Sequence, residues 1–442
     1  MYAFASADSF FGSSNFDRAD SPIFTRTCES CRNLQNGSCL GSRCHNRKGQ
    51  RKGAPQYEAS LLLELVTDRA EFDALAEEWA ELYDRSGAFS NPFLSFGWCW
   101  NWCNHFLGEG SGTELCILTG RRFGRLVMVW PMVRQRVFGM TNLTWLGAPV
   151  SQYGDVLAEK SSDDLELLEM GWDYLRREVS ADFISLGRVR DDGTITPLLK
   201  KLGVQVTRQD SAPYVDLASA DSFDAYAERY SSRHRKKRRR SLRQLEEKGV
   251  VNHAFHYDGA EARVLTERII EMKHRWLKEK GIVSSGLSDQ RTTAFFADVA
   301  EGVGGYSTGC RVIALTCGDE LVAGEISFAS KDNVSGHIVV FNSDYDKQSP
   351  GLLMTEDNLR LCKEFGYERY DFMGPCEQHK LDWADGVVDM NDYAKASSLR
   401  GYLWVNGYLG WGRPRLKTLV NSIPPGVRAR VAKLHPALAR FA

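Results

Sequence analysis

The stretch GHIVVFNSDYDKQSPGLL, residues 336–353, carries the pattern from which we predict the fold. Its apolar run from Gly336 to Phe341 is typical of a buried strand, and Ser349-Pro350-Gly351 then begins a helix, because proline is tolerated in a first helical turn. Apolar side chains continue along this helix until Gly366, and Tyr370 to Gly374 reads as the next strand. Strand, helix and strand in this order predict an α/β domain.

The same order of elements occurs earlier in the chain. Two strand-like runs, Glu114 to Thr119 and Leu126 to Val133, precede a helix over Ser161 to Val179 and a strand over Asp182 to Leu186. In the second half, a hairpin formed by Arg311 to Thr316 and Leu321 to Ala329 precedes the stretch quoted above. The repeated order predicts two similar α/β domains with mixed sheets, in tandem. We expect a leader over residues 1–56, domains over 57–215 and 216–400, and a tail over 401–442.

Length and composition narrow the class of protein. The chain has 442 residues, 43% of them hydrophobic and 11% aromatic, with a net charge of -1. This composition excludes a chain that is disordered over most of its length, and the charge excludes a globally basic nucleic-acid-binding protein. The longest apolar run, Leu126 to Val133, is too short to span a membrane. The eleven cysteines fit reduced thiols, and no secretory signal is visible, so we expect a cytoplasmic protein.

The leader contains four cysteines that allow two interpretations. Cys28, Cys31, Cys39 and Cys44 have a C-x2-C and C-x4-C spacing that could place four thiolates around zinc. The alternative, which we favour because the second pair is widely spaced and the loop is short, is a disordered leader that binds no metal.

Two segments are strongly basic. The predicted helix from Asp221 to Gly249 contains an unbroken basic run from Arg233 to Arg240, and the segment from Arg400 to Ala442 has eight Lys or Arg residues and no Asp or Glu. The helix could present a solvated face, bind an anionic acceptor or carrier, or bind nucleic acid. Nucleic acid is the least favoured of the three, because no aromatic residues are interleaved. The tail could dock on an anionic membrane surface or pack back on the second domain.

Several short motifs occur together in one order: Asp344 to Leu353, then Asp371 to Gly374, then His379-Lys380 with Trp383. With them, the chain resembles the second domain of GNAT-type acyltransferases, and more closely the CelD/BcsL type of cellulose-biosynthesis acetyltransferase, a relative of the Fem peptidyltransferases. The basic helix from Tyr230 to Gly249, and the segments Phe93 to Trp102 and Trp130 to Met132, add to a resemblance over about residues 60–400. His379 departs from the pattern, since the family usually has tyrosine before the lysine.

The resemblance implies transfer of an acyl group, in the first place acetyl, from acyl-CoA to a hydroxyl or amine of a saccharide or envelope precursor, as in exopolysaccharide or cellulose biosynthesis. The helix start would hold the CoA pyrophosphate on its free N–H groups. The residues expected to bind the cofactor are Gln348, Ser349, Gly351, Leu352 and Leu353. A strand-edge N–H near Asn342 and Ser343 would polarise the thioester carbonyl.

The nucleophile needs a proton acceptor, so a carboxylate or imidazole should face the cleft. Glu325 interrupts the apolar strand Leu321 to Phe328, where a charge must act in catalysis, be paired or point outward. Asp371 follows the same reasoning at the end of the next strand, and Lys380 could hold substrate or phosphate charge. His337 is a weaker base candidate, since a histidine at the start of a strand is more often on the surface.

Two other functions remain open on the sequence. A Fem-like transferase would use aminoacyl-tRNA, with the basic helix on RNA phosphates. A non-enzymatic adaptor would bind nucleic acid through the cysteine cluster and the basic helix.

Overall fold

The computed structural model describes residues 61–86, 91–108, 110–160, 164–282, 284, 286–413 and 415. Backbone contacts group residues 58–442 into one compact unit. The four leader cysteines and the tail beyond residue 415 lie outside the described residues, so the zinc interpretation and most of the predicted tail stay predictions.

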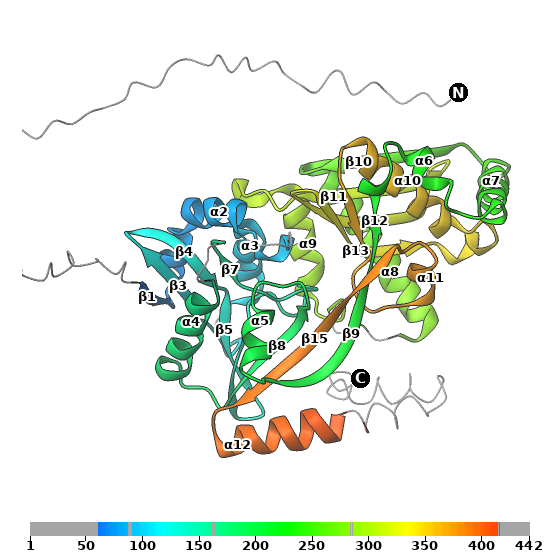
Figure 1. Cartoon of the computed structure of the whole chain (residues 1–442). Coiled ribbons are helices and arrows are strands. Elements are labelled where there is room, and N and C mark those ends of the chain that lie inside the picture. Colours follow the sequence, from blue (N-terminus) through cyan, green and yellow to red (C-terminus); the bar gives the residue numbers. More distant parts are fainter. Residues whose placement is uncertain are drawn as a thin grey trace, which may run out of the picture. The chain divides into compact units, whose positions relative to one another are not determined.

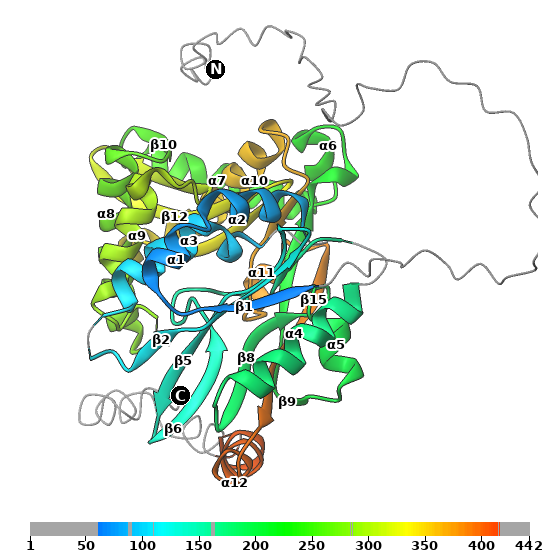
Figure 2. The ribbon, with the colours of Figure 1, turned by 90° about the vertical axis from the view of Figure 1, so that its left-hand side faces the viewer.

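The first half of the unit begins with a strand, four helical segments and six strands in succession, after which α4 and α5 alternate with the last two strands (Figures 1 and 2). Its elements are β1 (Leu62–Val66), α1 (Arg69–Asp73), α2 (Ala76–Arg85), η3 (Pro92–Leu94), α3 (Phe96–Phe106), β2 (Thr113–Leu115), β3 (Ile117–Arg122), β4 (Arg125–Trp130), β5 (Met132–Val137), β6 (Met140–Trp145), β7 (Leu157–Ala158), α4 (Asp164–Glu178), β8 (Phe183–Arg190), α5 (Thr196–Lys201) and β9 (Gln205–Asp216).

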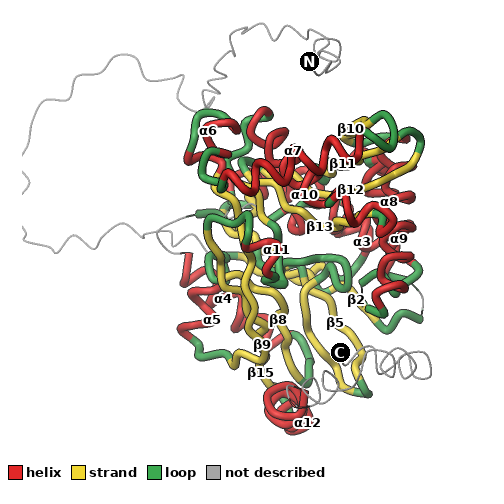
Figure 3. The backbone as a smooth tube through the Cα atoms, turned by 90° about the vertical axis from the view of Figure 1, so that its right-hand side faces the viewer, coloured by secondary structure: helices red, strands yellow, loops and turns green. Residues whose placement is uncertain are grey.

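The second half contains the stretch quoted at the outset. Its elements are η4 (Leu217–Ser219), α6 (Phe223–Ala227), α7 (Ser232–Glu246), β10 (Val251–Tyr257), α8 (Ala260–Lys280), α9 (Arg291–Glu301), η5 (Val303–Gly305), β11 (Cys310–Cys317), β12 (Glu320–Ser330), β13 (Asn333–Phe341), η6 (Ser343–Gln348), α10 (Pro350–Glu364), β14 (Arg369–Asp371), α11 (Gln378–Leu381), β15 (Gly386–Ala396), α12 (Leu399–Tyr402) and η7 (Leu403–Gly412). Helix α12 lies at the end of the long strands that is farthest from α6 and α7 (Figure 3).

The strands form a small sheet and a long one. The small sheet has the order β1-β3-β4-β7, and the long one has the order β10-β11-β12-β13-β14-β9-β15-β8-β6-β5-β2. Each half contains one parallel pair in the long sheet, β6 with β8 and β13 with β14, and a helix, α4 or α10, lies between the two strands in sequence. The predicted mixed α/β class with two similar halves in tandem is therefore confirmed.

The long sheet runs through both halves without a break. Strand β9 pairs with β15 along residues 205–214 and with β14 at its last residues, and β15 pairs on its other side with β8. The two long strands β9 and β15 extend side by side between the halves in Figure 1. The halves thus share their backbone hydrogen bonds as well as their side-chain packing.

Two predicted elements of the first half are divided in the structure. The expected strand Leu126 to Val133 is β4 and β5, which separate at Pro131 and join different sheets. Proline has no N–H to give to a ladder, so the strand cannot continue through it. The expected strand Glu114 to Thr119 is likewise divided, between β2 in the long sheet and β3 in the small one.

The predicted basic helix is also two helices, α6 and α7. The Ser231 side chain caps α7 by accepting a hydrogen bond from the His234 amide, so a new helix begins there. Leu242 and Leu245 of α7 pack with Tyr345 of η6 and Leu353 of α10 in one apolar cluster. The basic helix is therefore fixed against the segment that leads into α10.

An aromatic cluster joins the two halves. The Trp98 ring of α3 lies edge-on to Phe295 of α9 and to Phe328 of β12, with centroids 4.9 and 5.0 Å apart. Phe93 and Phe296 belong to the same cluster of buried side chains. Among the described residues, none of the helices combines the length and the apolar character that crossing a membrane requires.

Candidate functional site

Strands β13 and β14 pair in parallel only over their first residues. Asn333 to Ser335 align with Arg369 to Asp371, after which the two strands no longer pair. Just beyond this point β13 has a bulge: Gly336 is opposite Ser327 and Ile338 is opposite Ile326, which leaves His337 without a partner. A bulge bends its strand and re-aims a side chain, and bulges are common next to active sites. The candidate site is the region where β13 and β14 no longer pair, together with the start of α10, the helix between them in sequence.

His337, the bulged residue, is held as a neutral imidazole. Its Nε2 donates to the Val150 carbonyl at 2.7 Å, and its Nδ1 is a buried atom without a hydrogen-bond partner. Burial lowers its pKa to about 4. The Phe93 and Phe296 rings lie edge-on to the imidazole, so it does not lie on the surface as strand starts usually place a histidine. Its free lone pair is on Nδ1.

Glu325 does not point outward, which was one of the three expectations for it. The side chain is 1% exposed, and its Oε1 accepts from Asn358 Nδ2 at 2.6 Å and from the Tyr370 hydroxyl at 2.8 Å. Burial raises the pKa of this carboxyl, while the Tyr370 hydrogen bond and the charge of Arg311 act against that rise. Glu325 thus lies in a buried network between β12, β14 and α10.

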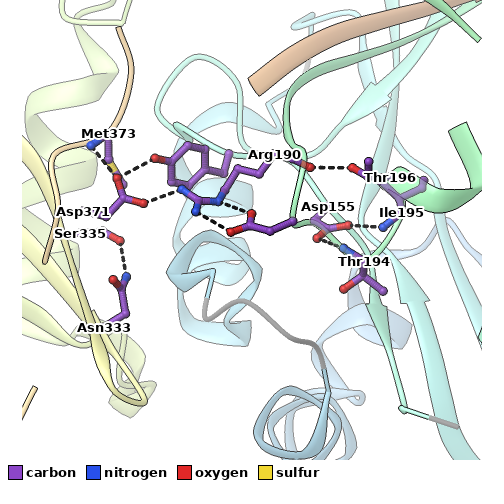
Figure 4. A network of polar contacts seen from close by, with 11 residues as sticks. Asp155, Arg190, Thr194, Ile195, Thr196, Asn333, Ser335, Asp371 and Met373 are labelled. Carbon is purple, nitrogen blue, oxygen red and sulfur yellow. Dashed lines mark hydrogen bonds and ion pairs between the residues drawn. The ribbon is translucent and has the colours of Figure 1, made fainter. Parts of the chain in front are cut away.

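Asp371 ends β14 and is completely buried. Its polar contacts are drawn in Figure 4. Its Oδ2 accepts from Arg190 Nη1 at 2.5 Å, and its Oδ1 accepts from the Tyr153 hydroxyl at 2.9 Å and the Met373 amide at 2.7 Å. Arg190 also donates to both carboxylate oxygens of Asp192, at 2.8 and 2.9 Å. Arg190 and Tyr153 were not predicted as site residues, since nothing near them in the sequence marks them as partners of a residue so far along the chain.

Lys380 and Asp371 both bond to the backbone of Met373. Lys380 Nζ donates to the carbonyls of Met373 and Pro375 at 2.9 and 3.1 Å, so Asp371 and Lys380 hold the amide and the carbonyl of the same residue, Met373. Burial lowers the pKa of Lys380. A second lysine, Lys273 of α8, donates to the Val339 carbonyl of β13 at 2.8 Å. Lys273 was not predicted as a site residue, because α8 carries many charged residues and nothing in its sequence distinguishes this one.

The start of α10 has the features expected of an anion cradle. Ser349 has a left-handed φ of 47° and makes no side-chain cap, and Pro350 occupies the first turn. The Leu352 and Leu353 amides reach only the Ser349 carbonyl, at 3.0 and 3.4 Å. The Gln348 side chain is 8% exposed, and its Oε1 is buried without a partner. A Cβ on Gly351 would lie 3.4 Å from the Phe341 ring.

The expected polarising N–H at Asn342 is already used. The Asn342 amide donates to the Val322 carbonyl at 2.8 Å, and its side chain accepts from the Asp344 amide at 3.0 Å. Asn342 therefore ends the β12–β13 ladder and begins η6, and it leaves no free N–H for a ligand.

The four catalytic candidates thus lie in three separate places. Asp371 and Lys380 meet at Met373, while Glu325 is bonded to Tyr370, which alternation places on the other face of β14, and His337 lies on the bulge. Within the described ranges, His, Cys, Asp and Glu side chains form no group that could hold a metal ion.

Comparison with known proteins agrees with this geometry. Residues 232–381 match the family model described as an acetyltransferase (GNAT) domain. The second half has the GNAT fold. The match covers α7 to α11, including the basic helix, the bulged strand, the start of α10 and Lys380. The CelD/BcsL type within this broad family stays a prediction.

Solved structures resemble the chain over both halves. The crystal structure of FemX is similar with a TM-score of 0.52 and 12% sequence identity, and the alignment covers 75% of this chain and 97% of FemX. L-PGS from Bacillus licheniformis aligns with a TM-score of 0.46 at 11% identity, over 78% of this chain and 97% of its own. A tandem GNAT protein from the clavulanic acid biosynthesis pathway aligns with a TM-score of 0.43 at 12% identity, over 76% and 99%. No curated protein matches the sequence.

Proposed function

We propose that the protein is an acyltransferase that moves an acyl group, in the first place acetyl, from acyl-CoA to a hydroxyl or amine of a saccharide or envelope precursor. The observation that carries this proposal is the start of α10 within the GNAT-matched segment: a helix start without a side-chain cap, where Gly351 leaves the backbone open to a ligand. A helix start of this kind suits phosphate groups, because its N–H groups and dipole favour negative charge.

The chain offers definite groups for this chemistry. The amide of Gly351 would face the pyrophosphate of the donor, and the amides of Leu352 and Leu353 would share with it the hydrogen bonds that they make to the Ser349 carbonyl. Gln348 would donate to the pyrophosphate from its side-chain nitrogen, Nε2. For the proton of the nucleophile, we propose His337, whose Nδ1 is without a partner, while the acceptor oxygens of Glu325 and Asp371 already receive hydrogen bonds from the protein. With a pKa near 4, the imidazole accepts a proton only as attack makes the nucleophile more acidic.

Aminoacyl-tRNA as the donor is the second candidate, and the surface of α7 favours it. Arg238 of this helix pairs with Glu356 and Asp357 of α10, but its other cations are exposed and form no ion pairs with described carboxylates. They are Arg233, Arg235, Lys236, Lys237, Arg239, Arg240 and Arg243. A fixed row of cations beside the donor site suits a polyanion.

Binding experiments separate the two donors. Thermal shift with acetyl-CoA, longer acyl-CoAs and free CoA should raise the melting temperature, because a ligand of the native state stabilises it. A parallel binding assay with aminoacyl-tRNA, at low and high salt, tests the alternative. Stabilisation by CoA compounds with no RNA binding supports the first donor. RNA binding that weakens when the α7 arginines are replaced, with no response to any CoA compound, would transfer the proposal to the second.

For the acceptor side we propose docking on an anionic membrane surface, with the protein at its inner face. Leu399, Tyr402, Leu403 and Trp411, in or next to α12 and η7, are 77, 57, 65 and 63% exposed. Arg400, Arg413 and Arg415 lie among them, and the chain from Arg400 to its last residue has no acidic side chain. Exposed apolar and aromatic groups interspersed with arginine fit the interface of an anionic bilayer. Trp404 instead packs on Phe138 and Phe183 of the first half.

Co-sedimentation of the full chain with phosphatidylglycerol and with phosphatidylcholine vesicles tests this surface. We expect binding to the anionic vesicles at low salt, and less binding when Leu403 and Trp411 are both replaced by Ser. If the double variant binds as well as the wild type, or if the wild type does not bind at low salt, this surface is not a membrane-docking site.

A further inference from the structure

Two lysine side chains reach opposite walls of the gap between β13 and the segment after β14. Lys273 comes from α8 and donates to the Val339 carbonyl of β13, and Lys380 comes from α11 and donates to the Met373 and Pro375 carbonyls. Both side chains are half-buried. The hydrogen bonds of the described residues therefore use one of the three donors of the Lys273 ammonium and two of those of Lys380.

The charge of Lys380 acts on Lys273, and the charge of Glu377 favours the charged form of both lysines without forming an ion pair with either. Burial lowers the pKa of Lys273 to about 8, and the charge of Lys380 lowers it further while that of Glu377 raises it. Burial also lowers the pKa of Lys380, against the charges of Glu377, Asp371 and Asp210. No described carboxylate makes an ion pair with either lysine. Two half-buried like charges destabilise one another, and an anion between them would relieve this.

The position of the pair separates it from the donor's phosphates. Those are assigned to the start of α10, which follows β13 through η6, whereas Lys380 contacts the chain after β14. Lys273 contacts β13 at Val339, two residues after His337, on the stretch where the reacting groups would meet. The lysines are thus placed on the side of the site that the second substrate would approach.

We propose that Lys273 and Lys380 together bind a carboxylate or phosphate group of the acyl acceptor. This inference rests on the proposed function, since it takes β13 as the place of acyl transfer. It narrows the acceptor to an anionic molecule and adds Lys273, on α8, to the site. The two ammonium groups position the acceptor, and no proton transfer is assigned to them.

Competitive acylation of the lysines with acetic anhydride over a range of pH, read by mass spectrometry, tests the proposal on the intact chain. The method gives an apparent pKa for each lysine separately. We expect inorganic phosphate or acetate, compared with chloride at equal ionic strength, to raise the pKa of Lys273 by about one unit, which corresponds to roughly tenfold tighter anion binding to the charged form. A response to phosphate alone assigns a phosphate-bearing acceptor, and a response to acetate alone assigns a carboxylate.

Variants separate binding from a structural role. Lys380→Met should abolish the anion-dependent shift at Lys273, while Lys278→Met, an exposed change on the same helix, should leave it intact. If the lysines serve only to hold the backbone carbonyls of Val339, Met373 and Pro375, Lys380→Met lowers the melting temperature, and no anion changes the pKa of Lys273. A pKa of Lys273 that is the same in phosphate, acetate and chloride overturns the inference.

Failure of the proposed function gives a different result. Acetyl-CoA is added to the same protein in a thermal-shift assay. Stabilisation by acetyl-CoA without any anion effect on Lys273 rejects the anionic acceptor and leaves the acyltransferase standing. An anion effect without a response to acetyl-CoA rejects the donor, and with it the reading of the anion site as an acceptor site.

Discussion

Arg190 Nη1 lies 2.5 Å from Asp371 Oδ2, although Arg190 ends a strand of the first half and Asp371 ends a strand of the second. Both side chains are buried, and the same aspartate accepts from the Met373 amide at 2.7 Å. Burial works against the charge on Arg190, but the neighbouring Asp371, with smaller contributions from Tyr153 and Asp192, raises its pKa. The pair therefore links the first half to the backbone that leads from β14 to Lys380.

Removal of one partner of this pair should strongly destabilise the protein. Arg190→Met leaves the Asp371 charge buried without compensation, and we expect a loss of about 3–5 kcal/mol in the free energy of unfolding, measured with urea. Asp371→Asn added to Arg190→Met should recover part of that loss. Arg134→Met, which breaks the exposed pair with Glu114, serves as control and should change stability by less than about 1 kcal/mol. Equal effects of Arg190→Met and Arg134→Met would contradict this account.

The proton acceptor can be identified by comparing three variants. His337→Gln should keep affinity for CoA and lose turnover by about 10²-fold, the usual scale for a lost general base. Glu325→Gln and Asp371→Asn should lower the melting temperature more than the turnover per folded molecule, because both carboxylates receive hydrogen bonds inside the fold. If instead either amide variant folds normally and loses turnover, that carboxylate is the base.

His337 should also make the protein sensitive to acid. Its folded pKa, about 4, is below the ordinary value of 6.5, so the native state binds fewer protons than the unfolded chain. The stability that depends on neutral His337 is therefore complete above pH 6.5 and is lost as the pH falls through 4. Besides burial, the charge of Arg188 acts on this imidazole. We expect the melting temperature to fall less steeply between pH 6.5 and 4 in His337→Phe than in the wild type.

The matched control for this measurement is His379→Phe, at an exposed histidine of α11. Its melting curves should follow those of the wild type across the same range of pH. If His337→Phe does the same, His337 does not account for the acid sensitivity.

Gly351 offers a test of the donor site that leaves the core intact. A side chain at this position meets only the Phe341 ring, at an ordinary contact distance of 3.4 Å, so Gly351→Val should fold. It should weaken binding of CoA at least tenfold, about 1.4 kcal/mol, because the β-branched side chain keeps phosphates away from the helix start. Titration calorimetry measures this. Gly108→Val, where an added Cβ has no neighbour within 4 Å, should bind CoA as the wild type does; unchanged affinity in both variants removes the helix start as the donor site.

The local sequence pattern was sufficient to predict some helices and strands and insufficient for others. The strand from Gly336 to Phe341 and the helix after Ser349 were predictable because apolar spacing, Pro350 and Gly366 are local signals. The division at Pro131 had a local cause too, but only the structure reveals that the strands on its two sides join different sheets.

The candidate site was predictable in part, for the same reason. Glu325 and Asp371 stood out as charges in apolar strands, yet their partners Asn358, Tyr153 and Arg190 come from distant elements, and the pairing of distant elements has no local signal. The bulge at His337 depends on the register between β12 and β13, which the sequence of β13 alone does not contain. Lys273 becomes notable only because α8 places it at the carbonyl of Val339.

The position of β9 between β14 and β15 determines where this chain can be divided into fragments. A fragment that begins at residue 216 would lack the strand that lies between β14 and β15, and two sheet edges would then face an empty strand position. Exposed edges of this kind recruit other chains and aggregate. Neither half can therefore be exchanged between proteins as a self-sufficient module, and a gene split at this boundary would have to supply both products together for either to fold.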